Sequence, residues 1–488
     1  MLYLKNNFKR DIFVDNLFNK IIMLRMKLIS IVIAILSIVI GSIILILDPI
    51  TFNISSSYRE KYCTNDELTK TLENGIHYDK INGECYFSSD YFEAREAFLK
   101  SAKKAGATLH RFPLVNNSLS TDVAILEGSP HKYLIHISGV HGTEGYAGSA
   151  VQGAALQYLS KNSNKKINKD IQFPTIIFVH IVNPFGMANN RRVNEDNIDL
   201  NRNFLTIEEF DTVIKRDPNF AGYVDIDFLI NPTILPFSLT VFNDFYSFGL
   251  TIHAAIKYGL NFIKRALVSG NYFKKTGLGY GGHRLSQSAL NLKEILINQL
   301  SIGDKAKSIV LFDVHTGLGP SGKDTLAQLA GERRRTIDSI FPTEYEQSAL
   351  IPGYKYIVGG MKESNYGNGP NSALSGYDLT VGTVTEDFCI KMLAPNLNED
   401  SRLCVLQEFG TRDMVIVGKT LTDENFAYHH GTEEQKKFYG NRVKNSFYVE
   451  TTKWKRNVVR RGLKVFLQGL EYSIQQIIDL EEVARDQI

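Results

Sequence analysis

The stretch KYLIHISGVHGTEGYAG, residues 132–148, carries the pattern that decides the fold. It opens with an apolar run typical of a buried strand and then passes through a turn rich in glycine. The chain continues into GSAVQGAALQYLSK at 148–161, whose composition predicts a helix. A strand that leads through a turn into a helix is typical of sheets covered by helices.

Further strands and helices flank this unit on both sides. Apolar residues at helical spacing run through 91–106 and end at Gly106. The tail at 456–488 is amphipathic and helical by the same test. The predicted strands, including the one already quoted, are 122–128, 132–140, 175–184, 308–317 and 402–411.

Several of these strands are continuous apolar runs, which is typical of parallel sheets buried on both faces. We therefore predict an α/β fold with a mixed, mostly parallel twisted sheet and helices on both faces. In such sheets, ligands bind beyond the carboxyl ends of the strands. The polar clusters of this chain all follow predicted strands.

Size and charge exclude one broad class of partner. The chain has 488 residues, of which 43% are hydrophobic, enough for one large α/β domain. Charged residues make up 22% and the formal net charge is only +3. A protein that binds nucleic acid usually concentrates Lys and Arg on one face, and no long basic run is present. We expect no nucleic-acid partner.

The segment LISIVIAILSIVIGSIILIL at 28–47 carries no charge and is long enough to cross a hydrocarbon core. Basic residues precede it, so the positive-inside rule places 1–27 in the cytoplasm and the remainder outside the cell or in a lumen. We predict one N-terminal transmembrane helix, acting as an anchor or uncleaved signal, and so a single-pass membrane protein. A cleaved signal peptide and a secreted protein are the alternative. Residues 48–88 read as a stalk, and 89–488 as the main domain.

Cysteine usage agrees with export. All four cysteines follow the apolar segment: Cys63, Cys85, Cys389 and Cys404. They form two couples that are close in sequence, Cys63–Cys85 and Cys389–Cys404, which are the natural disulfide pairs. Four cysteines permit three pairings, and four reduced thiols are a further alternative. Two glycosylation acceptors, Asn53 and Asn116, lie on the predicted outside.

Three residues at strand ends have the side chains of a zinc site. His141 and Glu144 follow the first quoted strand with two residues between them, and His315 follows the apolar strand that begins at 308. Imidazole and carboxylate groups are good zinc ligands. The His-x-x-Glu spacing alone is a weak signal, and a solvated loop would also contain it. Glu408 ends another buried strand, where a carboxylate is either paired or functional.

A second polar cluster strengthens this interpretation. HIVNPFGMANNRRVNEDNIDLNRNF at 180–204 follows a buried strand and gathers several groups that bind anions. Arginine presents a fixed fork of donors that suits carboxylates and oxyanions. The cluster members are Arg191, Arg192, Asp199, Asn201 and Arg202.

With these motifs in this order, the chain resembles the M14 zinc carboxypeptidase superfamily, in particular its uncharacterised branch of the DUF2817 type. The resemblance covers roughly residues 90–460 and rests on HGTEG, NEDNIDLNRNF, DVHTGLG and EFGT together. It implies a zinc carboxypeptidase-like fold with one Zn²⁺ per chain, held by His141, Glu144 and His315.

The same resemblance implies roles for the remaining polar residues. Asp199 supports a histidine that binds zinc, and Glu408 is the general base. Asn201 and Arg202 grip the substrate carboxylate. Arg192 polarises the scissile carbonyl, with Arg191 close enough to remain an alternative. The family also uses a tyrosine beside the substrate, for which Tyr377 is the candidate.

These roles imply a metallocarboxypeptidase that cleaves an amide bond next to a free carboxylate, with water activated by zinc and Glu408 as base. Its substrate is a peptide or an acyl-amino acid with a free carboxylate. One alternative is a zinc amidohydrolase that deacylates N-acyl-amino acids, like the aspartoacylase branch. The other is a membrane-tethered binding protein without activity on the same fold.

Overall fold

In the computed structural model, the described residues are 63, 81–114, 118–162, 173–234, 240–327, 340–341 and 379–485. The chain divides into two compact units, one comprising Met1–Thr51 and Ile234–Gly259 and the other Phe52–Thr233 and Leu260–Ile488. In the first unit the described part is almost entirely one helix, α9 (Thr240–Tyr258). All other elements belong to the second unit.

A seven-stranded mixed sheet organises the second unit, in the order β1-β2-β4-β3-β5-β7-β6. The central strands β4, β3, β5 and β7 run parallel, while β1, β2 and β6 join antiparallel at the two sides. The strands are β1 (Thr108–Pro113), β2 (Ser120–Leu126), β3 (Ser129–Ser138), β4 (Pro174–His180), β5 (Ser308–Ser321), β6 (Asp324–Ala327) and β7 (Arg402–Gly410). The mixed, mostly parallel sheet predicted from the apolar runs is confirmed.

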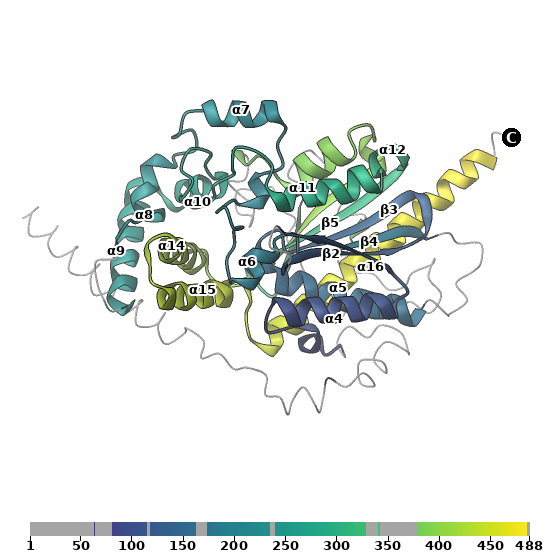
Figure 1. Cartoon of the computed structure of the whole chain (residues 1–488), viewed down its shortest axis with the longest axis horizontal. Coiled ribbons are helices and arrows are strands. Elements are labelled where there is room, and N and C mark those ends of the chain that lie inside the picture. The colour runs from purple at the N-terminus through teal and green to yellow at the C-terminus, as the bar shows by residue number, and fades with distance from the viewer. Residues whose placement is uncertain are drawn as a thin grey trace, which may run out of the picture. The chain divides into compact units, whose positions relative to one another are not determined.

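Helices and shorter helical turns connect these strands (Figure 1). The α-helices of this unit are α4 (Tyr91–Lys104), α5 (Gly145–Asn162), α6 (Pro184–Ala188), α7 (Ile207–Lys215), α8 (Asp227–Ile230), α10 (Leu260–Ser269), α11 (Gln287–Lys293), α12 (Ile302–Lys305), α14 (Met414–His430), α15 (Glu433–Phe447) and α16 (Thr452–Arg485). The shorter turns are η2 (Gly83–Tyr86), η3 (Gly142–Glu144), η4 (Leu200–Arg202), η5 (Val224–Ile226) and η9 (Glu399–Ser401), and two π-helical segments are η6 (Glu294–Gln299) and η8 (Val384–Leu393).

The sheet separates two hydrophobic cores, because successive side chains of a strand point to opposite faces. On β5, Phe312 belongs to the core under α4, α5 and α16, whereas its neighbour Leu311 belongs to the core under α11, α12 and η8. Neighbours on β4 divide in the same way, with Phe178 on the first face and Ile177 on the second. Figure 1 shows α4 and α5 below the strands and α11 and α12 above them. The predicted cover of helices on both faces is confirmed.

One predicted strand is too long. We expected a strand through 175–184, but β4 ends at His180. Ile181 takes a positive φ of 57°, which leaves the extended conformation. Asn183 then caps α6 by accepting a hydrogen bond of 2.8 Å from the amide of Gly186. The Asn-Pro dipeptide therefore begins a helix instead of ending a strand, as Pro at the first helical position favours.

Two disulfides are present, Cys63–Cys85 and Cys389–Cys404, which confirms both predicted pairs. Disulfides persist in oxidising compartments, so they indicate an extracellular or secreted location. The predicted membrane segment at 28–47 and the acceptors Asn53 and Asn116 lie outside the described residues. Within the described ranges, no helix has both the length and the apolar character needed to cross a bilayer.

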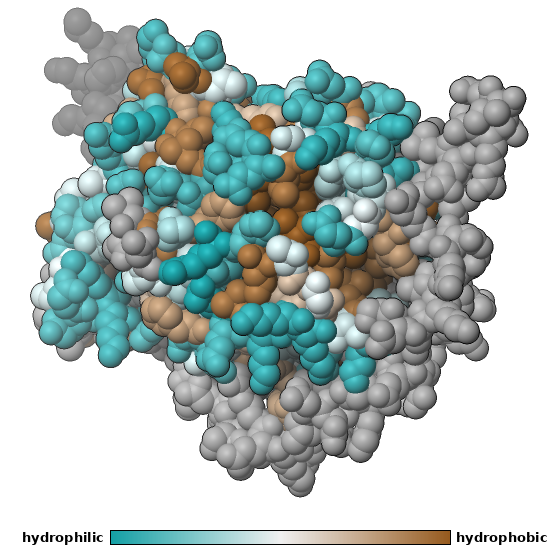
Figure 2. All heavy atoms as spheres, turned by 45° about the vertical axis from the view of Figure 1, so that its right-hand side comes forward, coloured by the Kyte–Doolittle hydropathy of each residue, from teal (hydrophilic) through white to brown (hydrophobic). Residues whose placement is uncertain are grey.

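The described surface is mixed in polarity. Figure 2 shows hydrophobic residues gathered in a central band on one face, with hydrophilic residues around them. Phe92 and Ile207 are among the large hydrophobic side chains that are exposed. Single exposed apolar side chains are ordinary on folded proteins.

Candidate metal centre

The turn between β3 and α5 carries the first two candidate ligands. His141 and Glu144 lie in and beside η3, directly after β3 leaves the sheet. This turn packs against the backbone of α6, since a Cβ on Gly142 would lie 2.0 Å from the carbonyl carbon of Gly186. A side chain at position 142 would therefore displace the turn, so Gly142 of the HGTEG motif is needed for packing.

Parallel strands bring the other two residues to the same edge of the sheet. His315 lies on β5 and pairs in register with Glu408 on the adjacent strand β7. β5 also pairs with β3, which leads into the turn that holds His141. The carboxyl ends of three neighbouring parallel strands thus meet at one place, as expected for a site in a sheet of this type.

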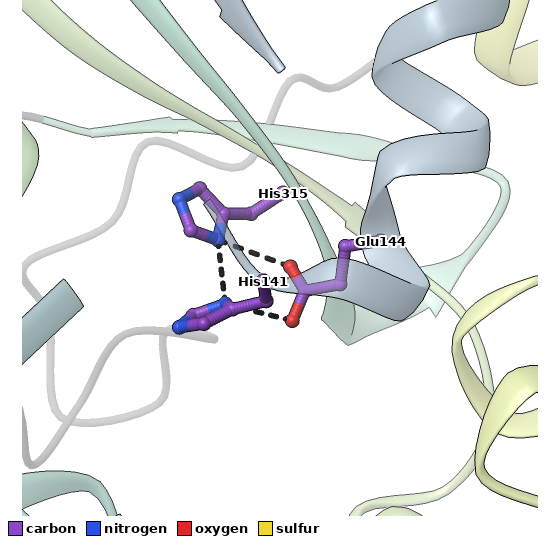
Figure 3. Close-up of side chains that lie close together, drawn as sticks. All are labelled: His141, Glu144 and His315. Carbon is purple, nitrogen blue, oxygen red and sulfur yellow. Dashed lines mark hydrogen bonds and ion pairs between the residues drawn. The ribbon is translucent and has the colours of Figure 1, made fainter. Parts of the chain in front are cut away.

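Three ligand atoms converge there (Figure 3). Nδ1 of His141 lies 2.9 Å from Oε1 of Glu144, and Nδ1 of His315 lies 3.0 Å from Oε2 of the same carboxylate. The two Nδ1 atoms lie 3.1 Å apart. All three side chains are buried, and their ligand atoms lie within 4.8 Å of one another. The structure therefore brings together the predicted metal ligands.

The far sides of both imidazole rings face carboxylates. Nε2 of His141 lies 2.9 Å from Oδ1 of Asp199, and Nε2 of His315 lies 2.7 Å from Oδ2 of Asp313. A carboxylate accepts a hydrogen bond, so Asp199 and Asp313 favour a proton on each Nε2, the form in which each Nδ1 can bind a metal. Carboxylate partners of this kind orient histidines that bind metals. Asp199 occupies the position predicted for it.

The charges in this cluster perturb one another strongly. Burial alone would raise the pKa of Glu144, but His141 and Arg192 hold it below its usual range. Burial alone would lower the pKa of His315, but Asp313 and Glu144 raise it well above the ordinary value for imidazole. The centre is thus a buried set of opposite charges, in which Glu144 and His315 are each kept ionised by the oppositely charged side chains beside them.

Arg192, rather than Arg191, reaches the ligand cluster. Nη1 of Arg192 donates to Oε1 of Glu144 at 2.7 Å, and its Nε donates to Oδ2 of Asp199 at 3.3 Å. Arg191 points elsewhere: it donates to Glu424 on α14 at 2.5 Å, and its guanidinium carbon lies 3.3 Å from the ring centroid of Tyr428. Arg191 therefore attaches α14 to this segment, while Arg192 lies beside the centre.

Asn201 and Arg202 lie close to the centre but are engaged with the protein itself. Oδ1 of Asn201 accepts a hydrogen bond of 2.9 Å from the amide of Val384. Arg202 donates from Nε and Nη2 to the carbonyl oxygen of Val268, at 2.9 Å for Nε, and from Nη1 to the carbonyl of Asn201 at 2.6 Å. Both side chains are buried. These contacts tie η4 to α10 and η8.

Glu408 is buried beside the ligands with an altered acidity. Its Oε1 accepts a hydrogen bond of 2.9 Å from the amide of Leu318. Burial, together with the negative charge of Glu144, raises the pKa of Glu408 to about 7, although His315, the Leu318 amide and Arg192 oppose the rise. A carboxylate with such a pKa can both accept and release a proton near neutral pH. Tyr377 lies outside the described residues.

The family comparison agrees with the motifs. A family model described as "Protein of unknown function (DUF2817)" matches residues 87–351 and 362–461. The chain belongs to the DUF2817 family. The match includes all the ligand, carboxylate and arginine positions discussed above, so the resemblance stated from the sequence is confirmed. No curated protein matches this DUF2817 chain.

Solved structures give distant likenesses to this DUF2817 protein. A candidate metallopeptidase from Shewanella denitrificans OS217 is 12% identical with a TM-score of 0.28, and the alignment covers 70% of this chain and 90% of that one. Bovine thrombin-activatable fibrinolysis inhibitor, solved in complex with tick carboxypeptidase inhibitor, is 11% identical with a TM-score of 0.34, covering 78% and 98%. The chemistry assigned to the DUF2817 chain below rests on its own residues.

Sequence reasoning missed one member of the centre, Asp313. It lies two residues before His315 on β5, so the two side chains leave the strand on the same face. The DVH spacing in a buried strand was a usable signal, because a buried aspartate needs a partner and His315 is the polar one of its two nearest neighbours on that face of the strand. In the DUF2817 chain Asp313 is completely buried.

Proposed function

We propose that this DUF2817 chain is a zinc-dependent hydrolase that cleaves an amide bond next to a free carboxylate, most simply a metallocarboxypeptidase. One observation carries the proposal. The Nδ1 atoms of His141 and His315 and the carboxylate of Glu144 converge on one another, while both Nε2 atoms face carboxylates.

The donor set fits zinc. Two imidazole nitrogens with lone pairs and one carboxylate, all within 4.8 Å of one another, repel unless a cation or a proton lies among them. Two histidines and one glutamate are zinc ligands in known hydrolytic sites and leave an open coordination position. When bound, zinc lowers the pKa of water and polarises a carbonyl group.

The chain's own residues then have separable tasks. Glu408, buried beside the ligands with its Oε1 held by the amide of Leu318, takes a proton from the attacking water and returns it to the leaving amine. Arg192, held by Glu144 and Asp199, stabilises negative charge that develops on the carbonyl oxygen. Asp199 and Asp313 keep both histidines in the tautomer that presents Nδ1.

We also propose where in the cell the protein acts. The two disulfides favour an oxidising compartment. We propose that the catalytic part works outside the cell or in a lumen, held at a membrane by the segment 28–47. The substrate is a peptide or an acyl-amino acid with a free carboxylate.

The test combines metal content with turnover. Zinc per chain is measured on the purified protein, and hydrolysis is followed on benzoyl-glycyl dipeptides and N-acetyl amino acids. Glu408→Gln should keep its zinc and lose at least about a hundredfold in kcat, the usual contribution of a general base. The matched control is Glu433→Gln, at an exposed position on α15, which should behave like the parent.

The outcomes separate three possibilities. Release of the C-terminal residue from the dipeptides supports a carboxypeptidase, and cleavage of N-acetyl amino acids alone supports a deacylase. Bound zinc with no hydrolysis of either the dipeptides or the N-acetyl amino acids would contradict the enzyme proposal and favour a binding protein.

A further inference from the structure

Helix α9 (Thr240–Tyr258) is rich in apolar and aromatic residues. Its sequence is TVFNDFYSFGLTIHAAIKY, in which Asp244 and Lys257 are the only acidic and basic residues apart from one histidine. Like the other described helices, α9 is not apolar enough over its length to cross a bilayer. What matters is therefore how its apolar residues are distributed between its faces.

Most exposed positions of α9, among the side chains that the structure describes, lie on one face. They are separated by four and three residues, the spacing of neighbours on one side of a helix. This exposed stripe consists of Phe242, Tyr246, Gly249, His253 and Ile256, and the exposed Lys257 adjoins it. Ile256 is 72% exposed, Phe242 49% and Tyr246 45%. A Cβ on Gly249 would meet no atom within 4 Å, so the stripe is also open in its middle.

Polar residues of α9 are turned away from the exposed stripe. Asn243, Ser247 and Thr251 follow one another at four-residue spacing, on the side of the helix roughly opposite the stripe. Asn243 is buried, and Ser247 and Thr251 are half-buried, with Oγ1 of Thr251 donating to the carbonyl of Ser247 at 2.9 Å. A surface helix of a soluble domain usually does the reverse, with its apolar stripe towards the core and its polar residues towards water. The exposed stripe of α9 therefore suits an apolar medium better than water.

The unit to which α9 belongs indicates what that medium is. It comprises Met1–Thr51 and Ile234–Gly259, and so includes the segment 28–47. That segment is uncharged and long enough to cross a hydrocarbon core, and it is the anchor proposed above. An anchor inserted there brings lipid to the unit that contains α9. Tyr246 agrees with such a place, because tyrosine is enriched where a membrane meets water.

We propose that α9 lies along the membrane surface and contacts lipid through the exposed stripe. This inference rests on the proposed membrane location and is independent of the hydrolytic chemistry. Interfacial helices bury their apolar face about 5–10 Å into the boundary between headgroups and acyl chains. Phe242, Tyr246 and Ile256 leave water on this contact, whereas Thr251 faces away from the lipid. The helix is thus a second attachment to the membrane, in addition to the anchor.

Quenching of tryptophan fluorescence tests the contact. The full chain is placed in nanodiscs of phosphatidylcholine, with and without bromine on the acyl chains, because brominated lipid quenches tryptophan close to it. The parent has one tryptophan, Trp454, which is buried and gives the baseline. Phe242→Trp and Ile256→Trp should each lose most of the fluorescence that they add, since both positions enter the lipid boundary. The matched control is Thr251→Trp, on the opposite face of the same helix, which should keep most of its fluorescence.

Several outcomes would overturn the proposal. They are the absence of quenching at both stripe positions, equal quenching at position 251, and a dimer in detergent that Ile256→Glu separates, which would assign the stripe to a second copy of the chain.

The proposed function can fail separately. No substrate enters the fluorescence measurement, so a chain without hydrolytic activity can still show the contact. Release of the parent from membranes by alkaline carbonate would contradict the anchor at 28–47. Brominated vesicles added to the released chain then decide the role of α9: quenching in Ile256→Trp but not in Thr251→Trp supports it, and its absence refutes it.

Discussion

At the scale of single residues, the Nε2 atoms of His141 and His315 control how the two imidazole rings are oriented in the centre. Asp199 and Asp313 set the direction of His141 and His315 by accepting from Nε2. Without these carboxylates each imidazole could place its proton on Nδ1, where it would block a metal ion. The orientation of both histidines therefore depends on two residues outside the set of candidate ligands.

Asp313→Asn should weaken zinc binding about tenfold to a hundredfold, the usual effect of losing a carboxylate behind a ligand histidine. An amide accepts a weaker hydrogen bond and can present its NH₂ group to Nε2, which favours the wrong tautomer. The measurement is a competition titration of zinc against a chelator. Asp122→Asn is the control, because Asp122 is also buried but pairs with Arg95 on α4 and not with a candidate ligand. Unchanged zinc affinity in Asp313→Asn would refute the role given to this carboxylate.

At the scale of elements, the centre is assembled where several segments are attached to one another. The β3–α5 turn rests on α6, η4 is bonded to α10 and η8, and η8 is joined to β7 by Cys389–Cys404. Both cysteines of this disulfide are buried, and Cys404 lies on β7, the strand that carries Glu408. The disulfide therefore braces β7 against η8, whose Val384 amide donates a hydrogen bond to Asn201.

Replacing Cys389 and Cys404 together by serine should lower the free energy of unfolding by about 3 kcal/mol. That figure is the chain-entropy contribution for a loop of this size, given a sequence separation of 15. Urea denaturation of parent and variant measures it. Both proteins are kept oxidised, so that Cys63–Cys85 stays intact in each and only the Cys389–Cys404 pair differs. A double variant as stable as the oxidised parent would contradict this account.

At the scale of the whole molecule, two cores on opposite faces of one sheet hold the fold together. His136 is buried in the first core, with its ring centroid 5.9 Å from those of both Phe178 and Phe466. Nε2 of Gln152 lies 3.4 Å from Nδ1 of His136. Within the described part of the chain, Nε2 of His136 has no hydrogen-bond partner. A charged imidazole is poorly accommodated there, so burial lowers the pKa of His136 to about 3.

This burial predicts a loss of stability in acid. The folded pKa of His136, about 3, lies below the ordinary value of 6.5, so the unfolded chain binds a proton first. The contribution of His136 is complete above pH 6.5 and is lost as the pH falls from 6.5 towards 3. At pH 5 the loss should be about 2 kcal/mol.

Urea denaturation at pH 8 and pH 5 measures this difference. In His136→Gln the loss between the two pH values should be smaller than in the parent by about 2 kcal/mol. His110→Gln, at an exposed position, is the control and should lose as much as the parent. If His136→Gln and the parent lose stability equally, the neutral buried state assigned to His136 is wrong.

Much of the fold was readable from local pattern. Apolar runs and helical spacing predicted α4, α5 and α16 and the strands β2, β3, β4, β5 and β7, because each buries a periodic face in one of the two cores. Strands β1 and β6 were not predicted. β1 is largely exposed and carries His110 and Arg111, so its sequence lacks the alternation of apolar and polar residues that marks a half-buried strand. β6 is only four residues long.

The sequence by itself determined the chemistry available to this protein, that is, which side chains stand at the ends of which strands. The tertiary structure decided their arrangement. It turned Arg192 towards the ligands and Arg191 away, set Asp313 behind His315, and brought the last turn of α10 alongside Arg202. The hydrophobic pattern of one segment shows which of its residues are buried. A site also depends on the directions in which side chains point, and these are set by packing between segments far apart in the chain. Such packing leaves little trace in the pattern of either segment.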